Sequence, residues 1–273
     1  MPMWREWRGP MDAPRAVFLH GWPMDHRDEA ATYDAAFAKA GYGRLYVDLP
    51  GMGRSADEPV PHDLDGYVDA IVRLIGDEIG DAPFVLGGTS AGALLARGVA
   101  ARLRPQISGL MLRVPLIVAD DAHRDRQTGI VLRSNAALIG ALARNESEVL
   151  NATPVLVQTR DWIDALMEKL AATVIPAGKA ANEDALEPIR HDPARYALRA
   201  ELPVFDGPAL VIAGRQDEVV GWRDQMAALA EWPRATVAIL DMAGHEFPLG
   251  PQKPLLDALV ADFLSRIAQA PVE

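Results

Sequence analysis

Short apolar runs alternate with longer amphipathic segments along the first 114 residues, and the alternation resumes from residue 209. Each apolar run has the length of a buried strand, and the runs lie at 16–19, 45–47, 84–86, 110–114, 209–213 and 236–240. Helical patterns separate or follow them at 27–40, 63–79, 91–103, 222–231 and 253–267. Because strands joined through helices build one sheet that is covered on both faces, the pattern predicts an α/β fold with a mostly parallel central sheet flanked by helices.

This alternation of strands and helices stops between residues 119 and 202, where no predicted strand is followed by a helix. Instead, one face at helical spacing is apolar and is formed by Trp162, Ile163, Leu166 and Leu170. A structureless loop of this length is improbable inside a compact domain. We therefore predict an α/β core made of residues 1–118 and 203–273, with residues 119–202 inserted as a helical cap over the carboxyl edge of the sheet.

The composition excludes several classes of function. The chain has no cysteine, which rules out disulfides, thiolate metal sites and a cysteine nucleophile. A formal net charge of −11 disfavours binding to nucleic acid or to an anionic membrane. No run approaches the ~18 apolar residues of a membrane span, and the first residues lack a signal-peptide pattern, so a cytoplasmic protein is expected. No His, Asp or Glu spacing matches a metal site, so no metal is expected.

The strongest local signal is Gly88-Thr89-Ser90-Ala91-Gly92, which matches G-x-S-x-G. It directly follows a predicted strand and opens a predicted helix, the context in which this motif presents a nucleophile. A sharp strand-to-helix turn exposes the serine hydroxyl at the carboxyl edge of the sheet, beside a helix N-terminus that favours developing negative charge. The same residues could form only a tight turn and a helix cap, but the flanking strand and helix favour Ser90 as a nucleophile.

A serine hydroxyl needs a general base, and the expected base is a histidine oriented by an acid. Of the six histidines, only His245 follows the last predicted strand, on a loop that can bring its ring over the sheet edge. Asp217, just after the strand at 209–213, is the expected acid, since its carboxylate can accept the imidazole Nδ1–H. Asp120 and Asp121 form a second, less favoured candidate site for the acid.

The fourth part of such a site is a pair of N–H groups that stabilises an oxyanion. His20-Gly21-Trp22 closes the first predicted strand. The backbone N–H of Trp22 can therefore pair with that of Ala91, the residue after the nucleophile. His20 itself is expected to bond loop backbone rather than to take part in catalysis.

Five segments, taken together and in this order, resemble the serine-nucleophile branch of the α/β-hydrolase superfamily, which often carries a helical cap. They are His20-Gly21-Trp22-Pro23, Asp48-Leu49-Pro50-Gly51-Met52-Gly53-Arg54-Ser55, Gly88-Thr89-Ser90-Ala91-Gly92, Gly214-Arg215-Gln216-Asp217 and Ala243-Gly244-His245. The resemblance implies cofactor-free acyl transfer, in which His245 deprotonates Ser90 and water releases the acid from an acyl-enzyme. Serine at position 90 argues against the haloalkane dehalogenase and epoxide hydrolase branches, whose nucleophile is a carboxylate. The two prolines within residues 246–251 depart from the helical start expected after such a histidine.

The predicted substrate is a small, largely apolar carboxylic ester, with Trp22, Trp162 and Met167 as candidate pocket residues. An aminopeptidase resembling proline iminopeptidase, a C–C bond hydrolase and a hydroxynitrile-type lyase use related machinery and stay open as alternatives. A basic cap pocket would favour the C–C bond hydrolase, an acidic pocket the aminopeptidase, and the lyase would need a cation. A non-enzymatic binding protein would be expected to have a broken triad. The expected partner is thus a small molecule, and a homodimer is left open.

Basic residues near the predicted site have two interpretations. The run His123-Arg124-Asp125-Arg126 could attract an anionic substrate, although such a run is more often a solvated helix face. Arg97 and Arg113 flank the predicted site in sequence, and each is expected to pair with a structural acid.

Overall fold

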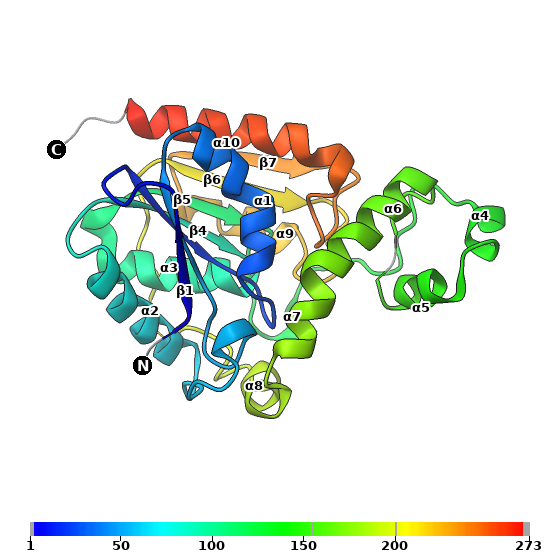
Figure 1. Ribbon diagram of the computed structural model, residues 1–273, viewed down its shortest axis with the longest axis horizontal. Helices are drawn as coiled ribbons and strands as arrows, with labels where there is room; N and C mark the ends of the chain where they lie inside the picture. Colours follow the sequence, from blue (N-terminus) through cyan, green and yellow to red (C-terminus); the bar gives the residue numbers. More distant parts are fainter. Residues whose placement is uncertain (1–2, 154, 200, 270–273) are drawn as a thin grey trace.

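Figure 1 shows a computed structural model of the chain, which describes residues 3–153, 155–199 and 201–269. It contains a seven-stranded sheet with the strand order β1-β3-β2-β4-β5-β6-β7. The strands are β1 (Arg5–Arg8), β2 (Arg15–Leu19), β3 (Gly43–Val47), β4 (Phe84–Thr89), β5 (Ile107–Arg113), β6 (Ala209–Gly214) and β7 (Ala235–Leu240). β1 pairs with β3 antiparallel, and every other neighbouring pair is parallel, so the sheet is mostly parallel as predicted.

Helices cover both faces of this sheet (Figure 1). The flanking helices are α1 (His26–Lys39) and α10 (Lys253–Ala268) on one face, with α2 (Leu64–Glu78) and α3 (Ala91–Leu103) on the other. Side chains alternate along each strand. In β2, Phe18 packs in the cluster with α1 and α10, whereas Val17 and Leu19 pack in the cluster with α2 and α3. Within the described part of the chain, none of the helices has both the length and the apolar character needed to cross a lipid bilayer.

Two elements differ from the sequence-based expectation. β1 has no counterpart among the predicted strands, because three of the four residues in Arg-Glu-Trp-Arg are charged and the strand lies at the edge of the sheet. The helix predicted at 222–231 is broken at Ala228: α9 (Arg223–Ala227) ends there, and a 3₁₀ turn follows at Leu229–Glu231. This turn returns Trp232, which is 3% exposed, to the core beside α2 and α3.

The described residues between 119 and 202 are helical, apart from connecting loops and one isolated bridge between Arg133 and Val157. The helices are α4 (Ala136–Gly140), α5 (Arg144–Ala152), α6 (Arg160–Lys169), α7 (Ile175–Ala180) and α8 (Glu183–Arg190), with a π-helical turn at Leu170–Val174 and a 3₁₀ turn at Asp121–His123. α4 and α5 extend away from the sheet (Figure 1). The apolar face that was predicted from Trp162 to Leu170 is buried in a small cluster with Leu249 of the core. The domain boundaries themselves remain a prediction.

Candidate active site

Ser90 lies in the sharp turn between β4 and α3, at the carboxyl edge of the sheet. Its backbone has φ 56° and ψ −121°, a region that costs a non-glycine residue about 1–3 kcal/mol. The turn is compact: a Cβ on Gly88 would lie 2.4 Å from the carbonyl oxygen of Gly92, and a Cβ on Gly92 would lie 2.3 Å from that of His20. Glycine is therefore required at both positions, which explains the spacing of the motif.

Hydrogen bonds hold this strained turn in place. The Ser90 N–H donates to the carbonyl oxygen of Arg113 at 3.0 Å, and the Ser90 carbonyl accepts from the N–H of Leu116 at 3.1 Å. Both partners lie at or just beyond the end of β5. The neighbouring strand thus fixes the backbone that presents the Ser90 hydroxyl.

The structure brings Ser90, His245 and Asp217 into one hydrogen-bonded row. His245 Nε2 lies 3.1 Å from Ser90 Oγ, and His245 Nδ1 lies 2.9 Å from Asp217 Oδ2. The other carboxylate oxygen of Asp217 accepts from the N–H groups of Val219 and Val220 at 2.9 and 3.0 Å. The three residues follow β4, β6 and β7, and because parallel strands end at the same sheet edge, their loops meet there.

The electrostatic environment polarises this row. Burial alone would raise the pKa of Asp217, but His245 and the two backbone N–H groups hold it below its usual value. Burial likewise opposes the imidazolium, yet the Asp217 carboxylate raises the pKa of His245 above 6.5. The carboxylate therefore stays ionised and stabilises a positive charge on the ring, which is what a general base needs after it accepts a proton.

The predicted oxyanion donors lie beside Ser90. Ala91 is the first residue of α3, so its N–H has no acceptor within the helix. The loop that carries Trp22 packs against the serine, since a Cβ on Gly21 would lie 3.2 Å from Ser90 Cβ. Among the described residues, neither the Trp22 nor the Ala91 N–H donates a hydrogen bond, so both are available to an oxyanion.

The alternative acids lie elsewhere. Asp120 is 2.7 Å from His123, and Asp121 binds Arg190 and Arg124, so neither contacts His245. Both lie beyond the end of β5 at Arg113, where Asp120 caps the 3₁₀ turn that Asp121 begins.

His20 bonds loop backbone, as expected. Its Nε2 accepts from the N–H of Leu49 at 3.0 Å, and its Nδ1 lies 2.8 Å from the carbonyl oxygen of Gly21.

A cavity of about 260 Å³ contains Ser90 and His245. Trp22 lies in its wall, as predicted, and contacts Tyr67 and Tyr196 edge-to-face with ring centroids 5.4 and 5.3 Å apart. These contacts fix the indole beside the serine. The wall also contains basic side chains that a largely apolar substrate would not need.

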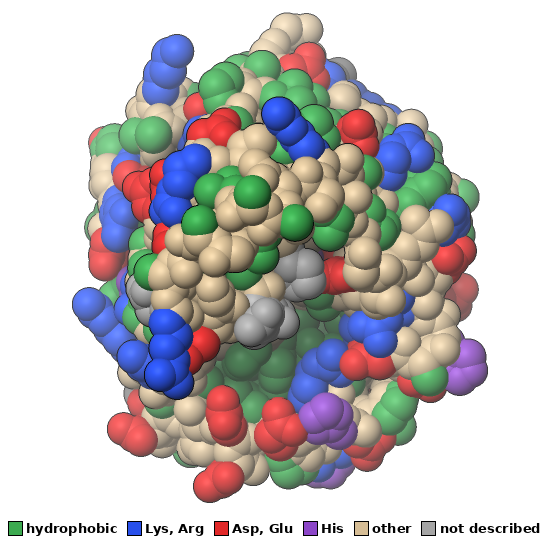
Figure 2. All heavy atoms as spheres, turned by 90° about the vertical axis from the view of Figure 1, so that its right-hand side faces the viewer, with side chains coloured by type: hydrophobic (Ala, Val, Ile, Leu, Met, Phe, Trp, Pro, Cys, Tyr) green, Lys and Arg blue, Asp and Glu red, His purple; other side chains and the backbone are tan. Residues whose placement is uncertain are grey.

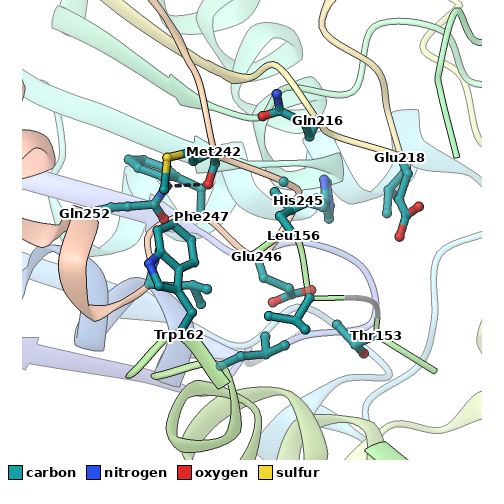
Figure 3. A pocket seen from close by; sticks show the side chains of 15 residues that line it. Thr153, Leu156, Trp162, Gln216, Glu218, Met242, His245, Glu246, Phe247 and Gln252 are labelled. Carbon is teal, nitrogen blue, oxygen red and sulfur yellow. Dashed lines mark hydrogen bonds between the residues drawn. The ribbon is translucent and has the colours of Figure 1, made fainter. Parts of the chain in front are cut away.

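A second cavity, of about 170 Å³, shares His245, Val219 and Glu246 with the first. Figure 3 shows Trp162 below Met242 and Gln252 at the left of the view, with His245 and Leu156 next to each other near its centre. The predicted pocket residue Trp162 therefore lines this cavity rather than the one that contains Ser90. The structure brings Met167 to neither cavity, because its side chain packs against the apolar cluster around α6.

The basic lining of the Ser90 cavity consists of Arg113, Arg124, Lys169 and Arg190. The interpretation of residues 123–126 as a solvated face is wrong for Arg124, whose side chain is 2% exposed. Sequence reasoning missed Lys169 and Arg190. The spacing along α8 could have indicated Arg190, because it lies four residues after the buried Leu186 and therefore on the same face of the helix.

Arg97 and Arg113 pair with acids, as expected. Arg97 binds Glu231 at 2.6 Å. Arg113 is 1% exposed and binds both Asp28 and Glu29 on α1. It thus ties the first turn of α1 to the end of β5.

Asp25, His26 and Asp48 form a buried group whose potential metal-ligand atoms lie within 4.8 Å of one another. Their oxygens already accept hydrogen bonds. Asp48 Oδ1 accepts from the N–H of His26 at 2.8 Å and Oδ2 from that of Arg54 at 2.8 Å, while Asp25 caps α1. The group therefore ties the loop after β3 to the start of α1.

Known proteins resemble this chain in sequence and in fold. The sequence model of the alpha/beta hydrolase family matches residues 16–258, which include Ser90, Asp217 and His245. The chain is 28% identical to the 2-succinyl-6-hydroxy-2,4-cyclohexadiene-1-carboxylate synthase of Salmonella paratyphi B, over 87% of this chain and 88% of that protein. It is 36% identical to a non-heme chloroperoxidase of Burkholderia pyrrocinia, over 36% of this chain and 34% of that protein. The solved structure of an alpha/beta superfamily hydrolase from Oenococcus oeni has a TM-score of 0.83 at 22% identity, covering 98% of this chain and 100% of that one.

Proposed function

The chain belongs to the alpha/beta hydrolase family, and on this basis we propose that it is a serine hydrolase that cleaves a carboxylic ester through an acyl-enzyme. The observation that carries the proposal is the unbroken row from Ser90 Oγ through His245 to Asp217, with distances of 3.1 and 2.9 Å. A protein that only bound a ligand would need neither this row nor the strained backbone of Ser90.

The proposed reaction needs only the side chains and backbone of this chain, the ester and water. Ser90 Oγ attacks the ester carbonyl carbon while His245 Nε2 takes the hydroxyl proton, and the N–H groups of Trp22 and Ala91 bind the oxyanion. The carbon–oxygen bond to the alcohol then breaks, and His245 returns the proton to the leaving oxygen. Water, deprotonated by His245, attacks the acyl-enzyme and releases the acid and free Ser90.

A fluorophosphonate probe is expected to label the protein at Ser90, because such probes phosphonylate a serine that is activated by a base, with loss of fluoride. The labelled residue is identified by peptide mass spectrometry. Ser90→Ala should abolish labelling, whereas Ser55→Ala, at a buried serine outside the row, should not change it. Equal labelling of the Ser90→Ala variant would rule out Ser90 as the nucleophile.

The pH dependence should report His245. The neutral imidazole is the active form, and Asp217 raises its pKa, so kcat/KM is expected to fall as the pH drops through a midpoint above 6.5. Below the midpoint the decrease should approach about tenfold per pH unit, as for one proton. Initial rates of ester hydrolysis between pH 5 and 9 test this. A flat profile would contradict a histidine base.

A C–C bond hydrolase is the second candidate, and the basic lining of the Ser90 cavity favours it, since such substrates often carry a carboxylate. The same lining gives no support to an aminopeptidase, because four cations would repel a substrate ammonium group. Product analysis separates ester hydrolysis from C–C bond hydrolysis. Ester cleavage releases an alcohol, whereas cleavage of a β-diketone carrying a carboxylate releases a methyl ketone and an acid.

A further inference from the structure

Basic side chains are concentrated around Ser90, although the protein as a whole is acidic. The lining of the Ser90 cavity includes two acids, Asp28 and Glu246, and four cations, Arg113, Arg124, Lys169 and Arg190. The formal net charge of the whole chain is −11. Figure 2 shows the side of the molecule that carries the helices between residues 119 and 202. It shows a hollow there, with hydrophobic atoms at its floor and Lys or Arg atoms beside it. Local positive charge in an acidic protein indicates a site for an anion.

Three of the four cations are committed to partners within the protein. Arg113 binds Asp28 and Glu29, and Lys169 Nζ lies 3.1 Å from the other oxygen of Asp28. Arg124 donates to three backbone carbonyl oxygens at 2.8–3.1 Å, those of Val118, Ala119 and Val219. These side chains shape the cavity and contribute to its field.

Arg190 differs from the other three. Its Nη2 donates to the two oxygens of Asp121 at 3.1 and 2.8 Å, and among the described residues its Nε and Nη1 groups have no acceptor. The guanidinium lies over the ring of Tyr196, 4.8 Å from the centroid, and the side chain is 24% exposed. It is thus held flat by an aromatic ring while most of its donors stay available.

The charges around Arg190 are unbalanced. Asp121 is shared by Arg190 and by the buried Arg124, so two guanidinium groups face one carboxylate. Burial lowers the pKa of Arg124 in spite of Asp121, and the positive charge of Arg190 adds to the effect. A second carboxylate beside these two arginines would restore the balance.

We infer that Arg190, supported by Arg124 and Asp121, binds a carboxylate carried by the acyl group of the substrate. The inference deepens the proposed function and rests on it. The leaving alcohol must receive a proton from His245, so it lies toward His245 and the second cavity, which His245 also lines. The acyl group then occupies the rest of the Ser90 cavity, whose volume of about 260 Å³ accommodates a short chain. The substrate class is therefore the half-ester of a short dicarboxylic acid.

A matched pair of esters tests the inference. Ethyl hydrogen succinate carries a carboxylate where ethyl 4-methylpentanoate carries an isopropyl group of similar shape. We expect kcat/KM of the wild-type protein to be higher for the half-ester, mainly through KM. Arg190→Gln should lower the half-ester value about 10- to 100-fold, the usual effect of losing a charge-assisted hydrogen bond, and should leave the neutral ester within about threefold. Arg190→Lys, which keeps the charge but not the fork of donors, should be intermediate.

Arg126→Gln is the control, because it removes the same charge from a side chain outside the cavity lining. An equal loss in this variant would mean that the overall field, not a site, sets the preference. No preference of the wild-type protein for the half-ester would also overturn the inference.

A second measurement does not depend on turnover. Glutarate should slow fluorophosphonate labelling of Ser90 in the wild-type protein and not in Arg190→Gln. If Ser90 is labelled but glutarate has no effect and the half-ester is not preferred, the carboxylate site is wrong and the proposed function stands. If Ser90 is not labelled at all, the proposed function itself fails.

Discussion

Asp217→Asn is expected to lower kcat for ester hydrolysis by about 10⁴-fold, with KM changed less than about threefold. The reason lies in the two backbone N–H groups of Val219 and Val220, which bind one oxygen of Asp217. They require an oxygen in the variant too, so the amide oxygen must face them and the NH₂ group must face His245 Nδ1. The ring proton is then forced onto Nε2, which faces Ser90 and can no longer accept its proton.

Asp206→Asn is a suitable control, since Asp206 is an exposed aspartate that pairs with Arg104 away from the row. Its kcat should stay within about twofold of wild type. The backbone hydrogen bonds of Asp217 persist in the asparagine variant, so both variants should unfold at similar urea concentrations. A decrease in kcat of less than tenfold for Asp217→Asn would mean that another group orients His245.

Sequence alone predicted the candidate triad because each of its members follows a strand. Chain order placed Ser90, Asp217 and His245 on loops at one sheet edge, and small residues around Ser90 marked the turn. The distances between the three side chains depend on loop backbone, which sequence patterns do not specify. The prolines after His245 illustrate this, since the loop there runs without helix until a 3₁₀ turn at Gly250–Gln252 and still brings the ring to Ser90.

The cationic lining was not predictable in the same way. Arg124, Lys169 and Arg190 lie in a loop and on two helices, and their convergence depends on how the segment between 119 and 202 folds over the sheet. Hydrophobic periodicity assigns a face to each helix but not the angle between helices. The same limit applies to β1, whose charged sequence fits an edge strand only once β3 lies beside it.

Arg113 shows how far a single buried charge can connect the elements of this site. Its guanidinium donates to Thr89 Oγ1 at 3.1 Å, directly before Ser90, and to the carbonyl oxygen of Phe247, two residues after His245. It also binds Asp28 and Glu29 on α1, and Asp28 in turn pairs with Lys169 on α6. Arg113 thereby connects the turn at Ser90, the loop after His245 and α1, and Asp28 extends the connection to α6.

The acids of this cluster have different protonation states. Burial would raise the pKa of Asp28, but Arg113 and Lys169 hold it well below its usual range. Burial raises the pKa of Glu29 to about 7, and the charge of Asp28 adds to that shift. The unfolded chain loses the Glu29 proton near its ordinary pKa of 4.5. Glu29 therefore contributes stability that is complete below pH 4.5 and is lost as the pH rises through about 7.

Arg113→Met is accordingly expected to lower the free energy of unfolding by about 3–5 kcal/mol, the usual cost of breaking a buried ion pair from one side. Urea denaturation followed by tryptophan fluorescence measures it. The difference from wild type should grow above pH 7, because without Arg113 the pKa of Glu29 rises further and only the variant keeps losing stability there.

Arg97→Met is the matched control, with an expected loss of about 1 kcal/mol, because its partner Glu231 is 30% exposed and can remain solvated. Adding Asp28→Asn to Arg113→Met should restore part of the stability, since it removes the carboxylate left with only Lys169. Equal stability losses for Arg113→Met and Arg97→Met would show that the cluster around Arg113 is no more than an ordinary ion pair.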